Sequence, residues 1–232
     1  MDVPAWVWFT ITAVAGVAGF ALLATDRAQR TARNRERRRW AALRGWQFEE
    51  TDQVLPTRWE NGAIAYYGTG TARDVVAGST FTADGRRQVY VFDHENNGKV
   101  NSVLVGVRCR RPLPVVVELW LPSVPFQREQ MPDLLGPVGQ RYAFVSDLTA
   151  ARRLITPDLV EAAEEIGGDV TVVWLEEDWV MASAPPNTAP ARLERLLRDL
   201  GELADVVDPF DAEGDTGSGG EVYRPNFDRK PS

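Results

Sequence analysis

The sequence predicts an α+β protein in which an N-terminal transmembrane helix precedes an antiparallel β-sheet domain with a few packing helices and a C-terminal amphipathic helix. Residues 3–24 carry no charged side chain. Strand-like segments follow, joined by the turn-forming dipeptides Asp84-Gly85 and Asn97-Gly98. Leucines then recur at three- and four-residue steps near the C-terminus. We divide the chain into a transmembrane helix at 1–25, a basic juxtamembrane helix at 26–45, a cytoplasmic α+β domain at 46–207 and a disordered tail at 208–232.

The uncharged run is long enough to cross a bilayer once. As a helix rising roughly 1.5 Å per residue it reaches about 33 Å, against a hydrocarbon core of about 30 Å. Trp6 and Trp8 lie near its N-terminal end, where indole rings favour the headgroup layer. A cleaved signal peptide would need a basic start and a small-x-small cleavage site, whereas Asp2 is the first charged side chain and Leu22 interrupts the match. A membrane span is therefore the favoured interpretation.

Arginines crowd the segment directly after this run. Between residues 26 and 44, eight arginines stand against two acids, Asp26 and Glu36. Because cytoplasmic flanks of membrane helices are enriched in basic residues, we expect a single-pass protein of the cell membrane with its N-terminus outside and its domain in the cytoplasm. An ordinary positive flank is the simpler interpretation of the cluster. Contact with anionic lipid headgroups is the sharper one, and its predicted residues are Arg27, Arg30, Arg33, Arg35, Arg37, Arg38 and Arg39.

The rest of the chain is acidic. The whole chain has a formal net charge of −7, to which the arginine segment contributes +6 and Asp2 contributes −1, so the residues after Gly45 carry −12. Nucleic acid repels such a body, and no aromatic platform accompanies the arginines, so we expect no nucleic-acid partner. Cys109 is the only cysteine, which excludes an intramolecular disulfide and a thiolate metal cluster. Its alternation with Val105 and Val107 predicts a buried side chain.

The first half of the domain has the composition of strands. The basic helix lacks Gly and Pro up to Leu43, and the domain begins near Trp46. Segments rich in Val, Tyr, Phe and Thr predict an antiparallel meander. These segments are residues 63–69, 72–82, 88–93, 100–109 and 115–120.

The second half mixes helices and strands after a proline-rich loop. A strand is predicted at 142–145, and Asp147 is placed to cap a helix ending at Leu154. Thr156 is a second N-cap, followed by Pro157, for a helix that ends near residue 166. Strands at 170–175 and 179–182 predict a hairpin with Glu176, Glu177 and Asp178 solvated at its tip. The last helix spans 189–206, and its apolar stripe is Leu193, Leu196, Leu197, Leu200 and Leu203.

The order of these features resembles a family. A membrane helix, an arginine-rich stalk, Gly45-Trp46-x-Phe48, a strand region, and Asp147 with Thr156-Pro157 ahead of the later helices are similar to uncharacterised membrane-anchored proteins of high-GC Gram-positive bacteria, carried as a domain of unknown function. The resemblance covers about residues 40–206 and brings no catalytic or binding residue with it.

Residues that suggest chemistry are few. His94 is the only histidine, and it stands beside the Asn97-Gly98 turn without a Gly-x-Ser-x-Gly motif, so a solvated turn position is the favoured interpretation. Residues 68–71, Gly-Thr-Gly-Thr, lack the Gly-Lys-Ser/Thr ending of a phosphate loop and predict a turn or bulge. We therefore expect no catalytic residue, metal or cofactor. Five tryptophans are expected to fill the core, with an exposed groove for a peptide or lipid as the alternative: Trp46, Trp59, Trp120, Trp174 and Trp179.

Three functional hypotheses follow. The leading one is a non-enzymatic cytoplasmic domain, held by one membrane helix, that binds an unidentified protein partner. The second is a sensor of anionic lipid surfaces that uses the arginine cluster. The third is a hydrolase whose site the sequence does not reveal.

Overall fold

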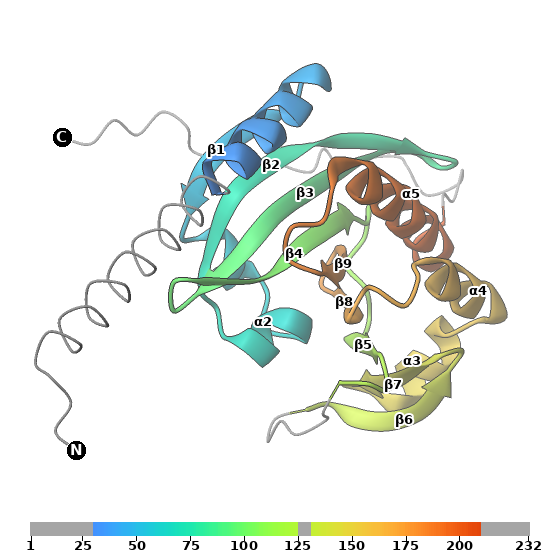
Figure 1. The fold of residues 1–232 in the computed structure, drawn as a ribbon. Helices are drawn as coiled ribbons and strands as arrows, with labels where there is room; N and C mark the ends of the chain where they lie inside the picture. Colours follow the sequence, from blue (N-terminus) through green and yellow to red (C-terminus); the bar gives the residue numbers. More distant parts are fainter. Residues whose placement is uncertain (1–29, 125–130, 210–232) are drawn as a thin grey trace, which may run out of the picture.

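A single nine-stranded antiparallel sheet organises the domain (Figure 1). The structure, a computed structural model, describes residues 30–124 and 131–209. The strand order is β1-β2-β3-β4-β9-β8-β5-β7-β6. The strands are β1 (Gln47–Asp52), β2 (Thr71–Thr82), β3 (Gly85–Asn96), β4 (Lys99–Arg108), β5 (Val117–Trp120), β6 (Asp133–Val138), β7 (Arg141–Val145), β8 (Val172–Glu176) and β9 (Trp179–Ala184). The predicted α+β class with an antiparallel sheet is confirmed.

Helices cover both faces of the sheet. One face carries α3 (Leu148–Leu154), α4 (Pro157–Glu165) and α5 (Pro190–Val207), together with the N-terminal helix, which is helical over residues 30–43. The opposite face carries the short 3₁₀ turn η1 (Leu55–Arg58) and α2 (Gly62–Tyr67). Two apolar layers result, because each element buries its apolar side against the sheet. All five leucines of the predicted α5 stripe are at most 2% exposed, as expected.

The N-terminal helix belongs to the domain by its packing. Trp40 is 6% exposed, Ala41 is fully buried, and the Trp40 ring meets that of Trp46 edge to face at 5.3 Å between centroids. The Trp40 indole also donates to Glu194 of α5 at 2.9 Å. The predicted basic stalk therefore packs against the sheet domain within the described residues.

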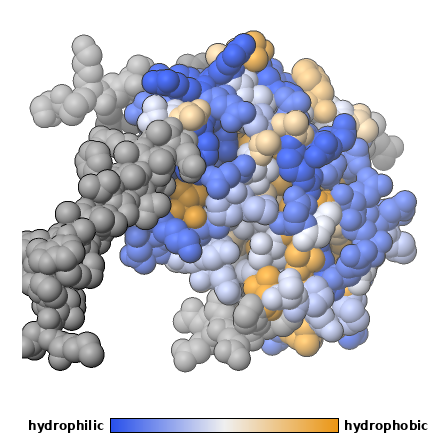
Figure 2. Space-filling model, in the orientation of Figure 1, coloured by the Kyte–Doolittle hydropathy of each residue, from blue (hydrophilic) through white to orange (hydrophobic). Residues whose placement is uncertain are grey.

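The predicted membrane span, with Trp6 and Trp8, lies outside the described residues. Within residues 30–124 and 131–209, no helix is both long and apolar enough to traverse a bilayer. The space-filling view shows a mainly hydrophilic surface with hydrophobic residues in small separate patches (Figure 2).

Local signals predicted two hairpin turns and the start of α3 correctly. Asp84-Gly85 joins β2 to β3, and Asn97-Gly98 joins β3 to β4 with positive φ at both residues, 53° and 73°. The Asp147 carboxylate accepts hydrogen bonds from the backbone N–H groups of Thr149 and Ala150 at 2.7 and 3.0 Å.

Three elements differ from the prediction. Residues 63–69, expected as a strand, begin with helix α2, whose first N–H, that of Gly62, donates to the buried carboxylate of Glu118 at 2.8 Å. Strand β1 was not predicted, because its polar sequence has no apolar alternation and only its backbone pairing with β2 makes it a strand. Strand β6 was assigned to the proline-rich loop, and it tolerates Pro137 because it lies at the edge of the sheet.

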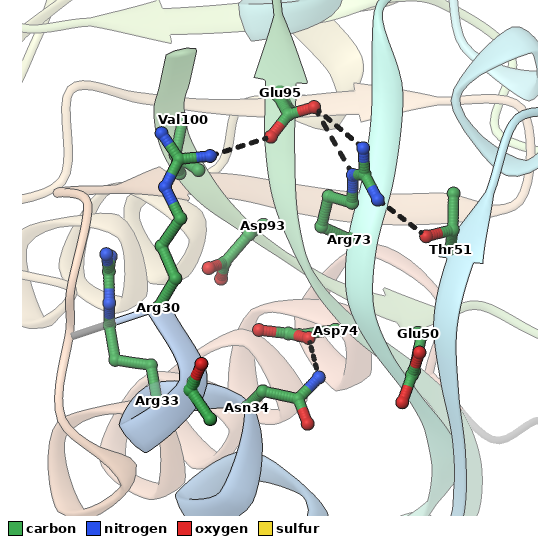
Figure 3. A pocket seen from close by; sticks show the side chains of 11 residues that line it. Arg30, Arg33, Asn34, Glu50, Thr51, Arg73, Asp74, Asp93, Glu95 and Val100 are labelled. Atoms are coloured by element: carbon green, nitrogen blue, oxygen red, sulfur yellow. Dashed lines mark hydrogen bonds and ion pairs between the residues drawn. The ribbon is translucent and has the colours of Figure 1, made fainter. Parts of the chain in front are cut away.

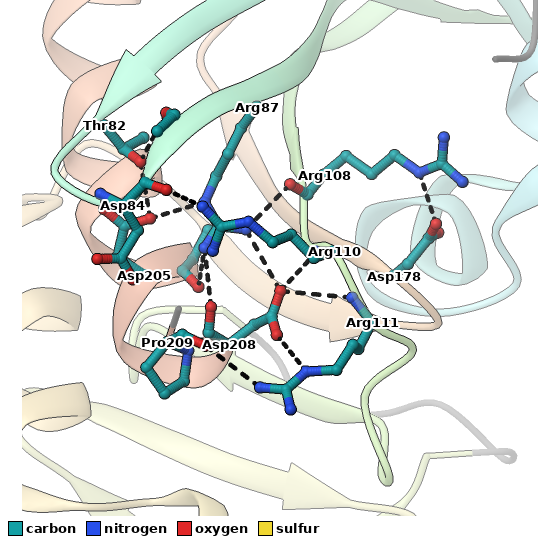
Figure 4. Close-up of polar contacts among 12 residues, drawn as sticks. Thr82, Asp84, Arg87, Arg108, Arg110, Arg111, Asp178, Asp205, Asp208 and Pro209 are labelled. Carbon is teal, nitrogen blue, oxygen red and sulfur yellow. Dashed lines mark hydrogen bonds and ion pairs between the residues drawn. The ribbon is translucent and has the colours of Figure 1, made fainter. Parts of the chain in front are cut away.

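Polar contacts link the C-terminal end of α5 to the strands (Figure 4). The Arg87 side chain is 1% exposed and donates to Asp205 at 2.7 Å and to Asp208 at 3.4 Å. It also donates to the backbone carbonyls of Ala204 and Asp208 at 3.2 and 2.9 Å. Asp208, which the sequence assigned to the tail, is 2% exposed and accepts from Arg111 at 2.9 Å. The remaining predicted tail, from residue 210 onward, lies outside the described residues.

Candidate functional site

A polar cleft separates the N-terminal helix from strands β1 to β3 (Figure 3). Its volume is about 370 Å³. Arg30 and Arg33 reach it from the helix, and Arg73 of β2 and Glu95 of β3 face them. The lining residues are Arg30, Thr31, Arg33, Asn34, Glu50, Thr51, Arg73, Asp74, Asp93, Glu95 and Val100. Three arginines and four carboxylates are among them, so the cleft carries both signs of charge.

A buried ion pair lies below the cleft. Arg37 of the helix contacts Asp93 of β3 at 3.1 Å, and the two side chains are 9% and 7% exposed. Burial raises the pKa of Asp93 above its ordinary value, and the Arg37 guanidinium only partly opposes that rise. Removing one partner of such a pair leaves an uncompensated buried charge, which costs about 3–5 kcal/mol. Arg37 is therefore a structural link between the helix and the sheet.

The rim of the cleft is held by Glu95. Its carboxylate accepts two hydrogen bonds from Arg73, at 3.3 and 3.1 Å, and pairs with Arg30 at 3.7 Å. Arg73 also donates to the hydroxyl of Thr51 at 2.9 Å. Three strands and the helix thus meet through one carboxylate and its two arginines.

Asp74 owes its position to a bulge in β2. The pairing register with β3 shifts between Arg73 and Val76, and Asp74 has a φ of 48°. Its carboxylate accepts a hydrogen bond from the side-chain amide of Asn34 at 2.5 Å. The bulge re-aims this side chain toward the helix, which a regular strand would not do.

The predicted lipid-contact arginines separate into groups. Arg37 is buried, Arg30 pairs with Glu95, and Arg38 pairs with Glu50 at 2.7 Å. Arg33 donates to the side chain of Asn187. Arg35 and Arg39 are exposed on the helix, and Arg27 lies outside the described residues. Headgroup contact stays a prediction for these residues, and the structure gives Arg30, Arg33, Arg37 and Arg38 partners within the protein.

His94 is fully buried, so the predicted solvated turn position is wrong. Its Nε2 atom lies 3.0 Å from the backbone oxygen of Thr69, and burial lowers the pKa of the imidazole. The paired strands continue past it to Asn96, which places His94 inside the sheet. Residues 68–70 form the connection between α2 and β2, and Thr69 in this connection supplies the partner of the histidine.

Cys109 is 3% exposed, which confirms the predicted buried position. Burial raises the pKa of its thiol to about 12. A thiol in that state is a poor nucleophile at neutral pH.

Four of the five tryptophans fill the layer under η1 and α2, as expected, and Trp46 is partly buried. The indole of Trp120 donates to Glu118 at 2.7 Å, and that of Trp174 donates to Glu176 at 3.2 Å. Glu176 is 5% exposed and also accepts from the backbone of Glu60 at 2.8 Å, so the predicted solvated hairpin tip is wrong at this residue. These two carboxylates satisfy the indole N–H groups of Trp120 and Trp174 inside a buried layer.

No group of three or more His, Cys, Asp or Glu side chains suited to a metal ion occurs among residues 30–124 and 131–209. A second cavity, of about 490 Å³, lies between α5 and the β2–β3 hairpin.

Comparison with known proteins places the chain in a family. The family model described as trehalose monomycolate transport factor TtfA matches residues 3–220. The chain belongs to this family. The expected family of unknown function is therefore wrong, because the TtfA family carries a functional description.

Two relatives support the assignment. Trehalose monomycolate transport factor A of Mycolicibacterium smegmatis is 28% identical over 226 residues, which cover 94% of this chain and 78% of the relative. The crystal structure of the mycobacterial trehalose monomycolate transport factor A, TtfA, has a TM-score of 0.64 and 27% identity, covering 76% of this chain and 96% of that chain. The fold of the described domain is thus also that of a solved TtfA structure.

Proposed function

We propose that this protein is a membrane-anchored, non-enzymatic factor in the transport of trehalose monomycolate, and that its cytoplasmic domain binds a protein of the transport machinery. The observation that carries the proposal is the family match, which runs from residue 3 to residue 220. That range includes the uncharged run at 3–24 as well as the whole described domain. The uncharged run and the domain therefore fall within one family match.

The chemistry of the domain supports a binding role. The two side chains best suited to nucleophilic or general-base work, Cys109 and His94, are both buried, and the histidine is held by a backbone carbonyl. Charged groups of the cleft are engaged in ion pairs, of which Arg30–Glu95 and Arg37–Asp93 join the helix to the sheet and Arg73–Glu95 joins two strands. In this structure these groups stabilise the packing of the domain, and the hydrolase hypothesis gains no support from them.

The membrane anchor accounts for the remaining features of the N-terminus. An uncharged segment of this length is stable in lipid, Trp6 and Trp8 mark one interface, and the arginines mark the cytoplasmic side. Such a membrane span keeps the domain at the membrane surface, where it can contact a transporter embedded in the bilayer.

Depletion in the native host tests the function. Trehalose monomycolate labelled with radioactive acetate is measured in the cell interior and in the outer envelope before and after loss of the protein. We expect the internal pool to rise severalfold and the whole chain to restore it, while a version without residues 2–25 fails to restore it. An unchanged distribution of the glycolipid after depletion contradicts the proposal.

Affinity purification tests the partner. The whole chain is solubilised in mild detergent and compared with a version lacking residues 46–207. Identical sets of co-purified membrane proteins would exclude binding through the domain.

A further inference from the structure

The end of the domain nearest residue 30 is set apart by its charge. The β3–β4 hairpin tip, residues 96–100, lies beside the first described turn of the N-terminal helix, because Arg30 donates to the backbone oxygen of Gly98 at 3.4 Å. The β9–α5 loop lies at the same end, where Arg33 contacts Asn187. Lys99 is exposed at the hairpin tip, and it is one of only two lysines in the chain.

Next to the hairpin tip, the basic side chains are more exposed than the acidic ones. The side chains of Arg30 and Arg73 are 48% and 46% exposed, whereas Glu95 between them is 14% exposed and Asp93 is 7% exposed. Lys99 adds a further exposed cation. Farther along the cleft, Glu50 of β1 is 68% exposed and pairs with Arg38, so the exposed positive charge at this end is concentrated at the hairpin tip and Arg30.

Covalent geometry places this end near the bilayer. Five residue steps separate residue 30 from residue 25, where the predicted span ends, and each step covers at most about 3.6 Å. Residue 30 thus lies within about 18 Å of the end of the span, whatever path the chain takes between them. The hairpin tip is one arginine side chain away from residue 30. The opposite end of β3, at Arg86, lies about 33 Å farther along the strand, at roughly 3.3 Å per residue.

We propose that the β3–β4 hairpin tip, with Lys99 and the exposed side chain of Arg30, docks on the anionic headgroups of the cytoplasmic leaflet and orients the domain on the membrane. This inference rests on the proposed membrane anchor. Basic side chains at an anionic leaflet each contribute about 1 kcal/mol, and the contribution falls off within a Debye length of the surface. Docking leaves the far end of the sheet and the β2–β3 hairpin directed away from the lipid.

Site-specific labelling tests the orientation. The single native cysteine is buried and its pKa is about 12, so an exposed introduced cysteine is labelled selectively at pH 7. Two variants of the whole chain, Lys99→Cys and Arg86→Cys, are labelled with an environment-sensitive fluorophore. They are reconstituted into vesicles that contain spin-labelled phosphatidylcholine as a quencher, with or without 30% phosphatidylglycerol.

We expect the label at position 99 to be quenched at least twofold more than the label at position 86. We expect phosphatidylglycerol to increase the quenching at position 99 at low salt, and 0.5 M NaCl to remove that increase. Equal quenching at the two positions in vesicles that carry the protein overturns the docking while leaving the anchor intact. Quenching at position 99 that ignores lipid charge overturns the anionic-lipid part. Protein that fails to float with the vesicles overturns the anchor itself.

Discussion

Arg87 is predicted to be the central polar contact between the end of α5 and the sheet. Its side chain is 1% exposed and forms charged hydrogen bonds to Asp205 and Asp208, whose side chains are 12% and 2% exposed. Arg87→Met keeps the aliphatic stem but leaves two carboxylates with less compensation. Breaking one side of a buried ion pair costs about 3–5 kcal/mol, a large share of the roughly 5–15 kcal/mol by which domains are stable.

Urea unfolding of the detergent-solubilised whole chain, followed by fluorescence of the buried tryptophans, measures this cost. With a slope of about 2 kcal/mol per molar urea, the midpoint of Arg87→Met should fall by about 1.5–2.5 M. Arg86→Met is the matched control, because Arg86 is exposed and donates to the hydroxyl of Ser79. The control should lose under about 1 kcal/mol. If the two variants unfold within 1 kcal/mol of each other, the reasoning about the buried network is refuted.

Three further predictions follow from the same physics. Arg37→Met should destabilise the domain by about 3–5 kcal/mol at pH 7, because it leaves Asp93 charged and buried without its partner. The loss should be smaller near pH 4, because burial raises the pKa of Asp93 and protonation then neutralises the carboxylate. An equal loss at both pH values in urea unfolding would refute this. Burial alone would raise the pKa of Asp208, but hydrogen bonds from Arg111 and from the backbone N–H groups of Arg110 and Arg111 together lower it. The lowered pKa stabilises the folded protein at pH values above the ordinary value near 3.8, and this stabilisation is lost as the pH falls through the lowered pKa. Asp208→Asn should therefore flatten the acid limb of a plot of unfolding midpoint against pH, and an unaltered limb would contradict the assignment. Gly70→Ala should cost about 2 kcal/mol or more in thermal unfolding, because its φ is 58° and an added Cβ would lie 2.4 Å from the backbone oxygen of Glu95. Gly98→Ala is its control, with positive φ but open space around the new methyl group, and an equal loss in both variants would exclude the steric argument.

Local signals made much of the fold predictable. The hairpin dipeptides, the Asp147 and Thr156 caps and the leucine stripe of α5 act within a few residues, and all are present in the structure. Elements that depend on distant partners were not predictable in the same way. Helix α2 begins at an N–H bound by Glu118, 56 residues away in the sequence, and β1 is a strand only because β2 lies beside it.

The candidate site shows the same division. The sequence identified the arginine cluster but interpreted it as a membrane flank or a lipid contact, because the partners of those arginines lie on other strands. Asp93 is 56 residues from Arg37, and Glu95 is 65 residues from Arg30, so no local spacing indicates either pair. One signal was available: Trp40, within the basic segment, is too large and apolar for a stalk that is solvated on all sides, and it marks the docked face of the helix.

The membrane orientation of the domain underlies both the proposed function and the docking of the hairpin tip, and labelling of intact cells tests it directly. The Arg86→Cys variant offers an exposed thiol while the native Cys109 stays buried. A membrane-impermeant maleimide should leave this variant unlabelled in intact cells and label it after lysis. Labelling of position 86 in intact cells would place the domain outside and contradict the account.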